Sequence, residues 1–230
     1  VIQYVDPFDF SAIRTALGAA TLFVVLIALR RPLGLQQVRE VALLGVLQTG
    51  AFTALIQWAL VAGGAGKTAV LVYTMPFWVV PMAWFVLGER VRGMQWVANA
   101  IAGCGLVLVL DPWAMGGSAF SNLLAVAGGV TWAAASVQAK RMRRTHDFDL
   151  LSLTAWQMLF GAIALCVLAL LHPSRPIDPT PYFWGALVFN AVFATGLAWL
   201  LWLFVLQRLS TGMAGLSALG IPMIGALAVW

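Results

Sequence analysis

The chain has 230 residues, of which 62% are hydrophobic and 9% are charged, and its mean hydropathy is +0.94. A soluble domain of this length needs a far more polar surface, so the composition excludes an ordinary soluble fold. The formal net charge of +5 is spread over short connections instead of one soluble surface, which excludes a nucleic-acid-binding site.

Eight apolar stretches follow one another along the chain, and we predict that each is a membrane-spanning helix. A helix rises about 1.5 Å per residue, so about 20 residues cross a hydrocarbon core of about 30 Å. No stretch carries Asp or Glu in its middle third, where a charge costs several kcal/mol. The stretches are 10–29, 41–62, 68–87, 94–110, 119–138, 150–171, 182–206 and 213–230.

The basic residues lie almost entirely in every second gap, beginning with the gap after the first stretch. The other gaps hold only Lys67 and Arg175, and Arg14 lies inside the first stretch. Cytoplasmic connections of membrane proteins carry an excess of Lys and Arg, so these gaps are predicted to be cytoplasmic and both ends of the printed chain external. The residues in these gaps are Arg30, Arg31, Arg39, Arg90, Arg92, Lys140, Arg141, Arg143, Arg144 and Arg208.

An internal repeat relates two parts of the chain. One gapless shift of 146 residues aligns the second and third stretches with the seventh and eighth, and a weaker shift of 143 lays Phe10-Ser11-Ala12 on Leu153-Thr154-Ala155. Gly and Pro set backbone geometry, so their recurrence indicates duplication better than matching Leu does. The matches include Thr49-Gly50 with Thr195-Gly196, Gly66 with Gly212, Pro76 with Pro222, and Trp84 with Trp230.

The repeats are predicted to be inverted. The second stretch follows a cytoplasmic gap, whereas its counterpart, the seventh, follows an external one. Inverted repeats place a substrate path near the midplane, with access alternating between the two sides.

The sequence begins at Val1 and stops at Trp230 inside an apolar stretch, so we expect a fragment. The expected fold is an all-α polytopic membrane protein with eight of ten helices in two five-helix repeats. The first, at 1–110, lacks its first helix, and the second, at 119–230, lacks its last.

The sequence resembles the EamA-type repeat of the drug/metabolite transporter superfamily. The resemblance rests on the Pro76 helix ending in Leu87-Gly88-Glu89, on the Ala/Gly-rich stretch 94–110 and on Arg14. It covers the whole chain as helices two to nine and implies ten helices in two inverted repeats. It also implies transport of small organic metabolites, with export of amino acids as the first expectation. The stretch 94–110 would be a peripheral helix that serves as a scaffold or as a homodimer contact.

Polar and aromatic residues at depth are the candidate substrate-binding residues. Thr49, Thr53 and Gln57 recur every fourth residue and form one stripe on a helix. Such side chains line a cavity or form interhelical hydrogen bonds worth about 1 kcal/mol or less, and both readings stay open. Deep aromatic rings with a polar atom need a polar partner or water, which favours cavity lining. The candidates are Gln48, Thr49, Tyr73, Trp132, Thr195 and Trp199.

Three further residue types could have a structural or a functional role. Pro76 and Pro222 each remove a helix hydrogen bond, which suits either a gate hinge or a static bend. Arg14 lies one turn inside the external end, and we expect it to extend to the lipid headgroups or to pair with Asp9, instead of meeting a substrate carboxylate. Glu89 is expected to cap the following helix, where the helix dipole favours a carboxylate.

The sequence shows no catalytic, metal or cofactor site. His146 and His172 have no partner at ligand spacing, and Cys104 and Cys166 are expected to be apolar core residues. We therefore expect a non-enzymatic secondary transporter in the lipid bilayer, in a bacterial inner membrane, with a small-molecule substrate and no nucleic acid. The alternatives are a nucleotide-sugar or sugar-phosphate carrier, which would need Lys or Arg in its cavity, and a channel or a non-transporting scaffold.

Overall fold

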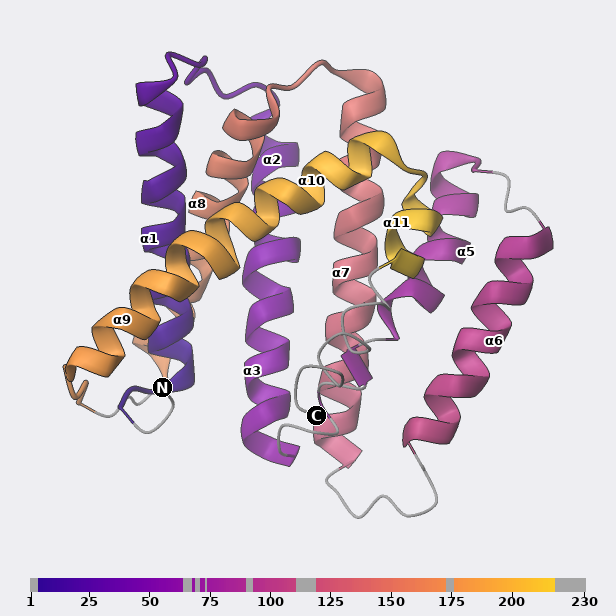
Figure 1. Cartoon of the computed structure of the whole chain (residues 1–230), viewed down its shortest axis with the longest axis horizontal. Coiled ribbons are helices and arrows are strands. Elements are labelled where there is room, and N and C mark those ends of the chain that lie inside the picture. The colour runs from indigo at the N-terminus through magenta and orange to yellow at the C-terminus, as the bar shows by residue number, and fades with distance from the viewer. Residues whose placement is uncertain are drawn as a thin grey trace. The chain divides into compact units, whose positions relative to one another are not determined.

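The structure is a computed structural model in which residues 4–63, 68, 71–72, 74–89, 93–110, 119–172 and 176–217 are described (Figure 1). Its regular secondary structure over these residues is helical, as predicted. The elements are α1 (Pro7–Ala28), α2 (Val38–Gly45), the π-helix η1 (Val46–Ala51), α3 (Phe52–Gly63), α5 (Met75–Leu87), α6 (Gly93–Leu110), α7 (Ala119–Thr145), α8 (Leu150–Leu171), α9 (Pro181–Phe189), the π-helix η2 (Asn190–Leu197), α10 (Ala198–Arg208) and α11 (Thr211–Ser217).

Five of the eight predicted spans are helices long and apolar enough to cross a bilayer. They are Pro7–Ala28, Val38–Ala62, Ala119–Thr145, Leu150–Leu171 and Pro181–Arg208. In its described part, the predicted stretch 68–87 contains the shorter helix α5, and α6 coincides with 94–110. The stretch 213–230 begins within α11 and continues outside the described residues.

The outer faces of the helices are apolar. Val24 and Ile27 on α1 are 65% and 61% exposed, and Leu170 on α8 is 87% exposed. Large exposed apolar side chains on several long helices are unfavourable in water but suit contact with lipid tails. Together with the length of the helices, this confirms the predicted all-α membrane fold.

Short polar residues set where the long helices begin. Asp6 accepts a hydrogen bond from the backbone N–H of Phe8 at 2.9 Å, and Asp149 accepts one from Ser152 at 2.9 Å. Thr180 does the same for Phe183 at 3.2 Å. Each of these caps satisfies an N–H group that has no partner within its own helix.

The chain forms two compact units. Unit 1 consists of Val1–Gln57 and Met142–Phe204, and unit 2 consists of Trp58–Arg141 and Val205–Trp230. Each unit takes segments from both halves of the sequence. The division of the chain by packing therefore differs from its division into the two predicted repeats. The repeats were inferred from duplicated sequence, and they stay a prediction.

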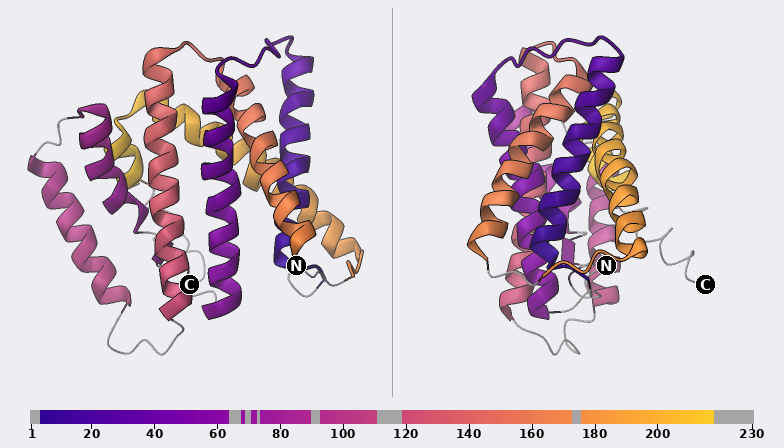
Figure 2. Two further views of the ribbon diagram at one scale, coloured as in Figure 1. Left: turned by 180° about the vertical axis from the view of Figure 1, so that it is seen from behind. Right: turned by 90° about the vertical axis from the view of Figure 1, so that its left-hand side faces the viewer.

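Unit 1 is built around the pair α1 and α8. These two helices pack most extensively against each other, α1 also packs on η2, and α8 packs on η1 and α2 (Figure 2). The centre of this unit is apolar and buried. Its core consists of Ala19, Leu22, Ala155 and Met158, with Phe23, Leu151, Leu159 and Trp199 packed around them.

In unit 2, polar side chains secure the ends of helices. Glu89, just after α5, accepts hydrogen bonds from the backbone N–H and the hydroxyl of Thr211 at 3.1 and 3.4 Å. Lys140 donates to the carbonyls of Leu206 and Leu209, both at 2.7 Å. The sequence did not reveal that Glu89 reaches α11, because its partner lies 122 residues away.

The helix α6 carries exposed apolar side chains at Met94, Val97 and Ile101. These three residues follow at helical spacing and share a face. The homodimer contact expected of this helix stays a prediction.

Candidate functional site

Two π-helices interrupt long helices of unit 1 at related positions. η1 lies between α2 and α3, and η2 lies between α9 and α10. Under the 146-residue shift, η1 falls within η2, and each contains one Thr-Gly pair, Thr49-Gly50 or Thr195-Gly196. π-Helices are rare and concentrate at functional sites. Their occurrence at repeat-related positions makes this region the candidate site.

Each π-helix lies against a glycine of a neighbouring helix. A Cβ atom built on Gly18 of α1 would lie 2.9 Å from the Ala191 carbonyl oxygen and 3.4 Å from Thr195 Cγ2. A Cβ atom on Gly161 of α8 would lie 2.8 Å from the Gly45 carbonyl oxygen and 2.7 Å from Thr49 Cγ2. Only glycine permits such close approach of backbones.

These two contacts are equivalent under the shifts seen in the sequence. The shift of 143 lays Gly18 on Gly161, and the shift of 146 lays Gly45 on Ala191. Unit 1 therefore holds two similar contacts, α1 on η2 and α8 on η1. The sequence indicated the duplication, but not that the duplicated segments pack in this way.

Arg14 links α1 to η2. Its Nη1 atom donates a hydrogen bond of 2.8 Å to the hydroxyl of Thr195. We expected Arg14 to extend to the headgroups or to pair with Asp9, and that expectation was wrong because the half-buried side chain turns inward to a neutral acceptor. Deep in a spanning helix, a charged group is stabilised by any available hydrogen-bond acceptor.

The predicted polar stripe on the second stretch meets two different neighbours. Gln57 donates to the Ser11 hydroxyl of α1 at 2.6 Å, whereas Thr49 contacts Gly161 of α8. A turn of π-helix contains more residues than a turn of α-helix. The side chain of Thr49 in η1 therefore points in a different direction around the helix axis from that expected for a continuous α-helix through Gln57.

Unit 1 includes three Gln and Thr side chains that are buried without a hydrogen bond to any part of the chain that the structure describes. Gln48 and Gln157 are 0% exposed, and both the nitrogen and the oxygen of each carboxamide lack a partner. The Thr49 hydroxyl, on a residue 1% exposed, also lacks one. A buried polar group without a hydrogen bond costs about 1–3 kcal/mol, so this concentration calls for an explanation.

Gln157 was not among the candidates taken from the sequence. It lies in the apolar helix α8, which also carries the polar residues Ser152 and Thr154 and which contacts η1. The shift of 143 places it opposite Arg14, and extending that weak alignment by two residues would have identified it.

The other candidates have different surroundings. Trp199 is half-buried beside the core of unit 1, whereas Trp132 is buried on α7 in unit 2, where its carbonyl accepts a 2.9 Å bond from Ser136. Pro76 lies in the first turn of α5, a position where a missing N–H is tolerated. Tyr73 and Pro222 lie outside the described residues.

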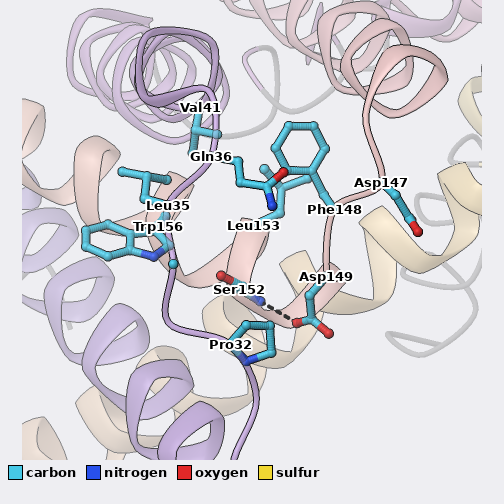
Figure 3. Close-up of a pocket in the computed structure, with 11 residues that line it drawn as sticks. Pro32, Leu35, Gln36, Val41, Asp147, Phe148, Asp149, Ser152, Leu153 and Trp156 are labelled. Carbon is cyan, nitrogen blue, oxygen red and sulfur yellow. Dashed lines mark hydrogen bonds between the residues drawn. The ribbon is translucent and has the colours of Figure 1, made fainter.

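A pocket of about 160 Å³ lies where the connection before α2 meets the one before α8 (Figure 3). Its walls include Pro32, Phe148 and Trp156, and the Trp156 ring nitrogen donates to the Leu33 carbonyl at 3.1 Å. Asp149 in its wall lies 3.6 Å from Arg31. Both connections are predicted to be cytoplasmic. Trp156 in the pocket wall directly precedes Gln157 on α8. Over the described residues, no group of three His, Cys, Asp or Glu side chains could hold a metal ion.

Comparison with known proteins places this architecture in a family. The EamA-like transporter family matches residues 1–111 and 119–230. The chain is 25% identical to the uncharacterized transporter YoaV of Bacillus subtilis (strain 168) over 236 residues, which cover 100% of this chain and 80% of that protein. It is 30% identical over 148 residues to a riboflavin transporter of Rhizobium johnstonii, covering 64% of this chain and 42% of that protein.

A solved crystal structure has the same fold. It superposes with a TM-score of 0.82 at 21% sequence identity, covering 97% of this chain and 77% of that one. The matched family, the named relatives and the apolar spanning helices agree with one another. This chain belongs to the EamA-like transporter family and is a multi-pass membrane transporter.

Proposed function

We propose that this protein is a secondary transporter of small organic metabolites such as amino acids, and that the polar groups beside η1 and η2 bind the substrate. The observation that carries the proposal is the burial of Gln48, Thr49 and Gln157 without hydrogen-bond partners in the described chain. Such groups lower the stability of the protein unless another molecule satisfies them during its working cycle.

The chemistry of these groups favours a small polar substrate. Each carboxamide offers both a donor and an acceptor, and the Thr49 hydroxyl offers one of each. The neighbouring core residues Ala155 and Met158 and the ring of Trp199 are apolar. Apolar walls with a few placed polar groups suit neutral or zwitterionic metabolites.

The two π-helices offer a place for the backbone to move. Backbone hydrogen bonds in a π-turn are out of register with those of the flanking α-helices, so a shift between π and α registers changes how the two ends of a helix are aligned. In our proposal η1 and η2 move in opposite phases as access alternates between inverted repeats at 1–110 and 119–230.

The direction and location of transport follow from the same proposal. We propose export across the bacterial inner membrane, with the connections at 30–40 and 139–149 in the cytoplasm because of their arginines and lysine.

A second candidate substrate is a flavin-like heterocycle. One relative is a riboflavin transporter, although its match covers 64% of this chain. Two buried carboxamides, Gln48 and Gln157, each pair a donor with an acceptor, which is the pattern needed to read the imide edge of such a ring. This candidate predicts uptake of a flavin in place of amino acids.

The test is flux through the purified full-length protein in liposomes. Labelled amino acids and riboflavin are offered separately, and counterflow exchange is measured against an excess of the same solute inside. We expect saturable uptake and counterflow for one class, both lowered in Thr49→Val. Flux without counterflow would indicate a channel, and no flux across a broad metabolite panel would contradict transport of such substrates.

A further inference from the structure

We infer that Arg14 binds a carboxylate of the transported molecule, which takes the place of the Thr195 hydroxyl. This inference rests on the function proposed above and narrows its substrate class to compounds with one carboxylate. Three observations carry it. They are the surroundings of Arg14, the lack of a second cation beside it among the described residues, and the neutral residue at the equivalent position on α8.

Arg14 lacks a countercharge within the described part of the chain. Within the described residues Arg14 donates a hydrogen bond to Thr195, a neutral residue, while Arg31 and Asp149 form an ion pair elsewhere in unit 1. The nearest acid before it along the chain, Asp9, forms no ion pair with Arg14 in the described residues, and Asp6 already accepts the N–H of Phe8. Charged residues in spanning helices are costly and are normally paired, so an unpaired guanidinium marks an ion or substrate path.

The surroundings of Arg14 are polar on one side. Ser11 and Thr15, on the same helix at positions i−3 and i+1, are buried, and so is Thr195 across from them. Of the five N–H donors of the guanidinium, one is used by Thr195. A planar carboxylate can accept two parallel hydrogen bonds from the guanidinium, and it binds more strongly than the single neutral hydroxyl.

One cation favours one negative charge. The other basic side chains in the described part of unit 1 lie at or beside the connections after α1 and α7, at Arg30, Arg31, Arg39, Arg143 and Arg144. A phosphate carries about two negative charges near neutral pH and would leave one of them uncompensated here. The site therefore fits a monocarboxylate better than a sugar phosphate.

The counterpart of Arg14 shows that a neutral residue fits the same surroundings. Gln157 occupies the equivalent position on α8, four residues before Gly161, as Arg14 precedes Gly18 on α1. The two contacts are alike in backbone packing but differ in charge. The substitution Arg14→Gln therefore installs at one contact the residue that the other already holds.

The experiment compares amino acids with their primary amides, which lack the negative charge of the carboxylate, in the full-length protein. Binding of leucine, phenylalanine and threonine, and of the primary amide of each, is measured as thermal stabilisation of the purified protein and as competition for flux in liposomes. We expect wild type to prefer the acid, and Arg14→Gln to lower its affinity for the acid roughly tenfold or more while binding of the amide is little changed. Arg14→Lys should restore part of the preference.

Two controls separate this inference from its alternatives. Arg39→Gln removes an equal charge from an exposed position in unit 1, and it should leave the preference unchanged. Liposomes of zwitterionic lipid and of lipid containing phosphatidylglycerol are compared, because an anionic headgroup bound by Arg14 would make the effect of Arg14→Gln depend on the anionic lipid.

The outcomes are distinct. Equal loss of acid and amide binding in Arg14→Gln, or dependence on the anionic lipid alone, would overturn the inference. A wild-type protein that transports none of the solutes contradicts the proposed function, but the stabilisation measurement still decides the inference. If no acid stabilises wild type more than its amide, Arg14 is not a carboxylate site.

Discussion

The Nη1 atom of Arg14 lies 2.8 Å from Thr195 Oγ1 and joins α1 to a π-helix 181 residues away in sequence. The equivalent pair on the other side of unit 1, Gln157 and Thr49, is packed just as closely in the backbone but makes no such bond. Two contacts of similar geometry therefore differ in whether their polar groups are satisfied. This difference yields predictions in which one contact serves as the control for the other.

Replacing Thr195 by valine should destabilise the protein. The substitution keeps the shape of the side chain but removes the acceptor of the Arg14 guanidinium, leaving a charged group without its hydrogen bond. We expect a loss of about 1–2 kcal/mol, measured as a lower midpoint of thermal unfolding in detergent micelles.

Thr49→Val is the matched control for that substitution. It makes the same chemical change at the repeat-related position, where the hydroxyl has no partner in the described chain. Its unfolding midpoint should be equal to that of wild type or higher, because a buried unsatisfied hydroxyl is removed. Equal destabilisation by the two substitutions would show that the Arg14 bond contributes nothing particular to stability.

Adding one methyl group to Gly161 should separate α8 from η1. The new Cβ atom would lie 2.8 Å from the Gly45 carbonyl oxygen, and backbone atoms cannot move aside as a flexible side chain can. Overpacking of this kind costs about 1–3 kcal/mol, so Gly161→Ala should unfold at a lower temperature.

Gly185→Ala provides the control for that prediction. Gly185 lies within α9, and a Cβ atom there would meet no atom within 4 Å. Alanine has the higher helix propensity, so this variant should be as stable as wild type or slightly more stable. A Gly161→Ala protein as stable as Gly185→Ala would contradict the close packing of α8 on η1.

The sequence predicts the spanning helices well because their length and composition are fixed by the bilayer. The stretch 10–29 corresponds to α1 at Pro7–Ala28, and 150–171 coincides with α8 at Leu150–Leu171. Asp6-Pro7 and Asp149 are local capping signals for the starts of these helices, but the predicted boundaries did not use them, and α1 begins three residues before the predicted stretch. These features are local, and local signals survive in a single sequence.

The π-helices and the partner of Arg14 could not be predicted in the same way. An extra residue in one helical turn shifts the periodic pattern of polar and apolar residues, so it can be recognised in an amphipathic helix. The residues around η1 and η2 are apolar on most sides, and no such pattern is present there. The Arg14–Thr195 bond depends on how α1 packs on η2, which is a long-range relationship. The shift of 143, extended to Gly161, relates the two contacts to each other, but it does not show which helices pack together.

The sharpest prediction concerns the two buried carboxamides. Gln48→Leu and Gln157→Leu each replace an unsatisfied amide by an apolar group of similar size, and each should raise the free energy of unfolding by about 1 kcal/mol or more. Transport of the substrate should fall at least tenfold if these amides bind it, since about 1.4 kcal/mol of lost binding corresponds to a factor of ten.

Gln57→Leu is the control, because Gln57 already donates to Ser11 at 2.6 Å, and its loss should lower stability. Thermal unfolding and liposome flux measured on the same three preparations separate the effects. Stability that falls in Gln48→Leu and Gln157→Leu as it does in Gln57→Leu would mean that the two amides hold the fold together, and that substrate binding has to be sought elsewhere.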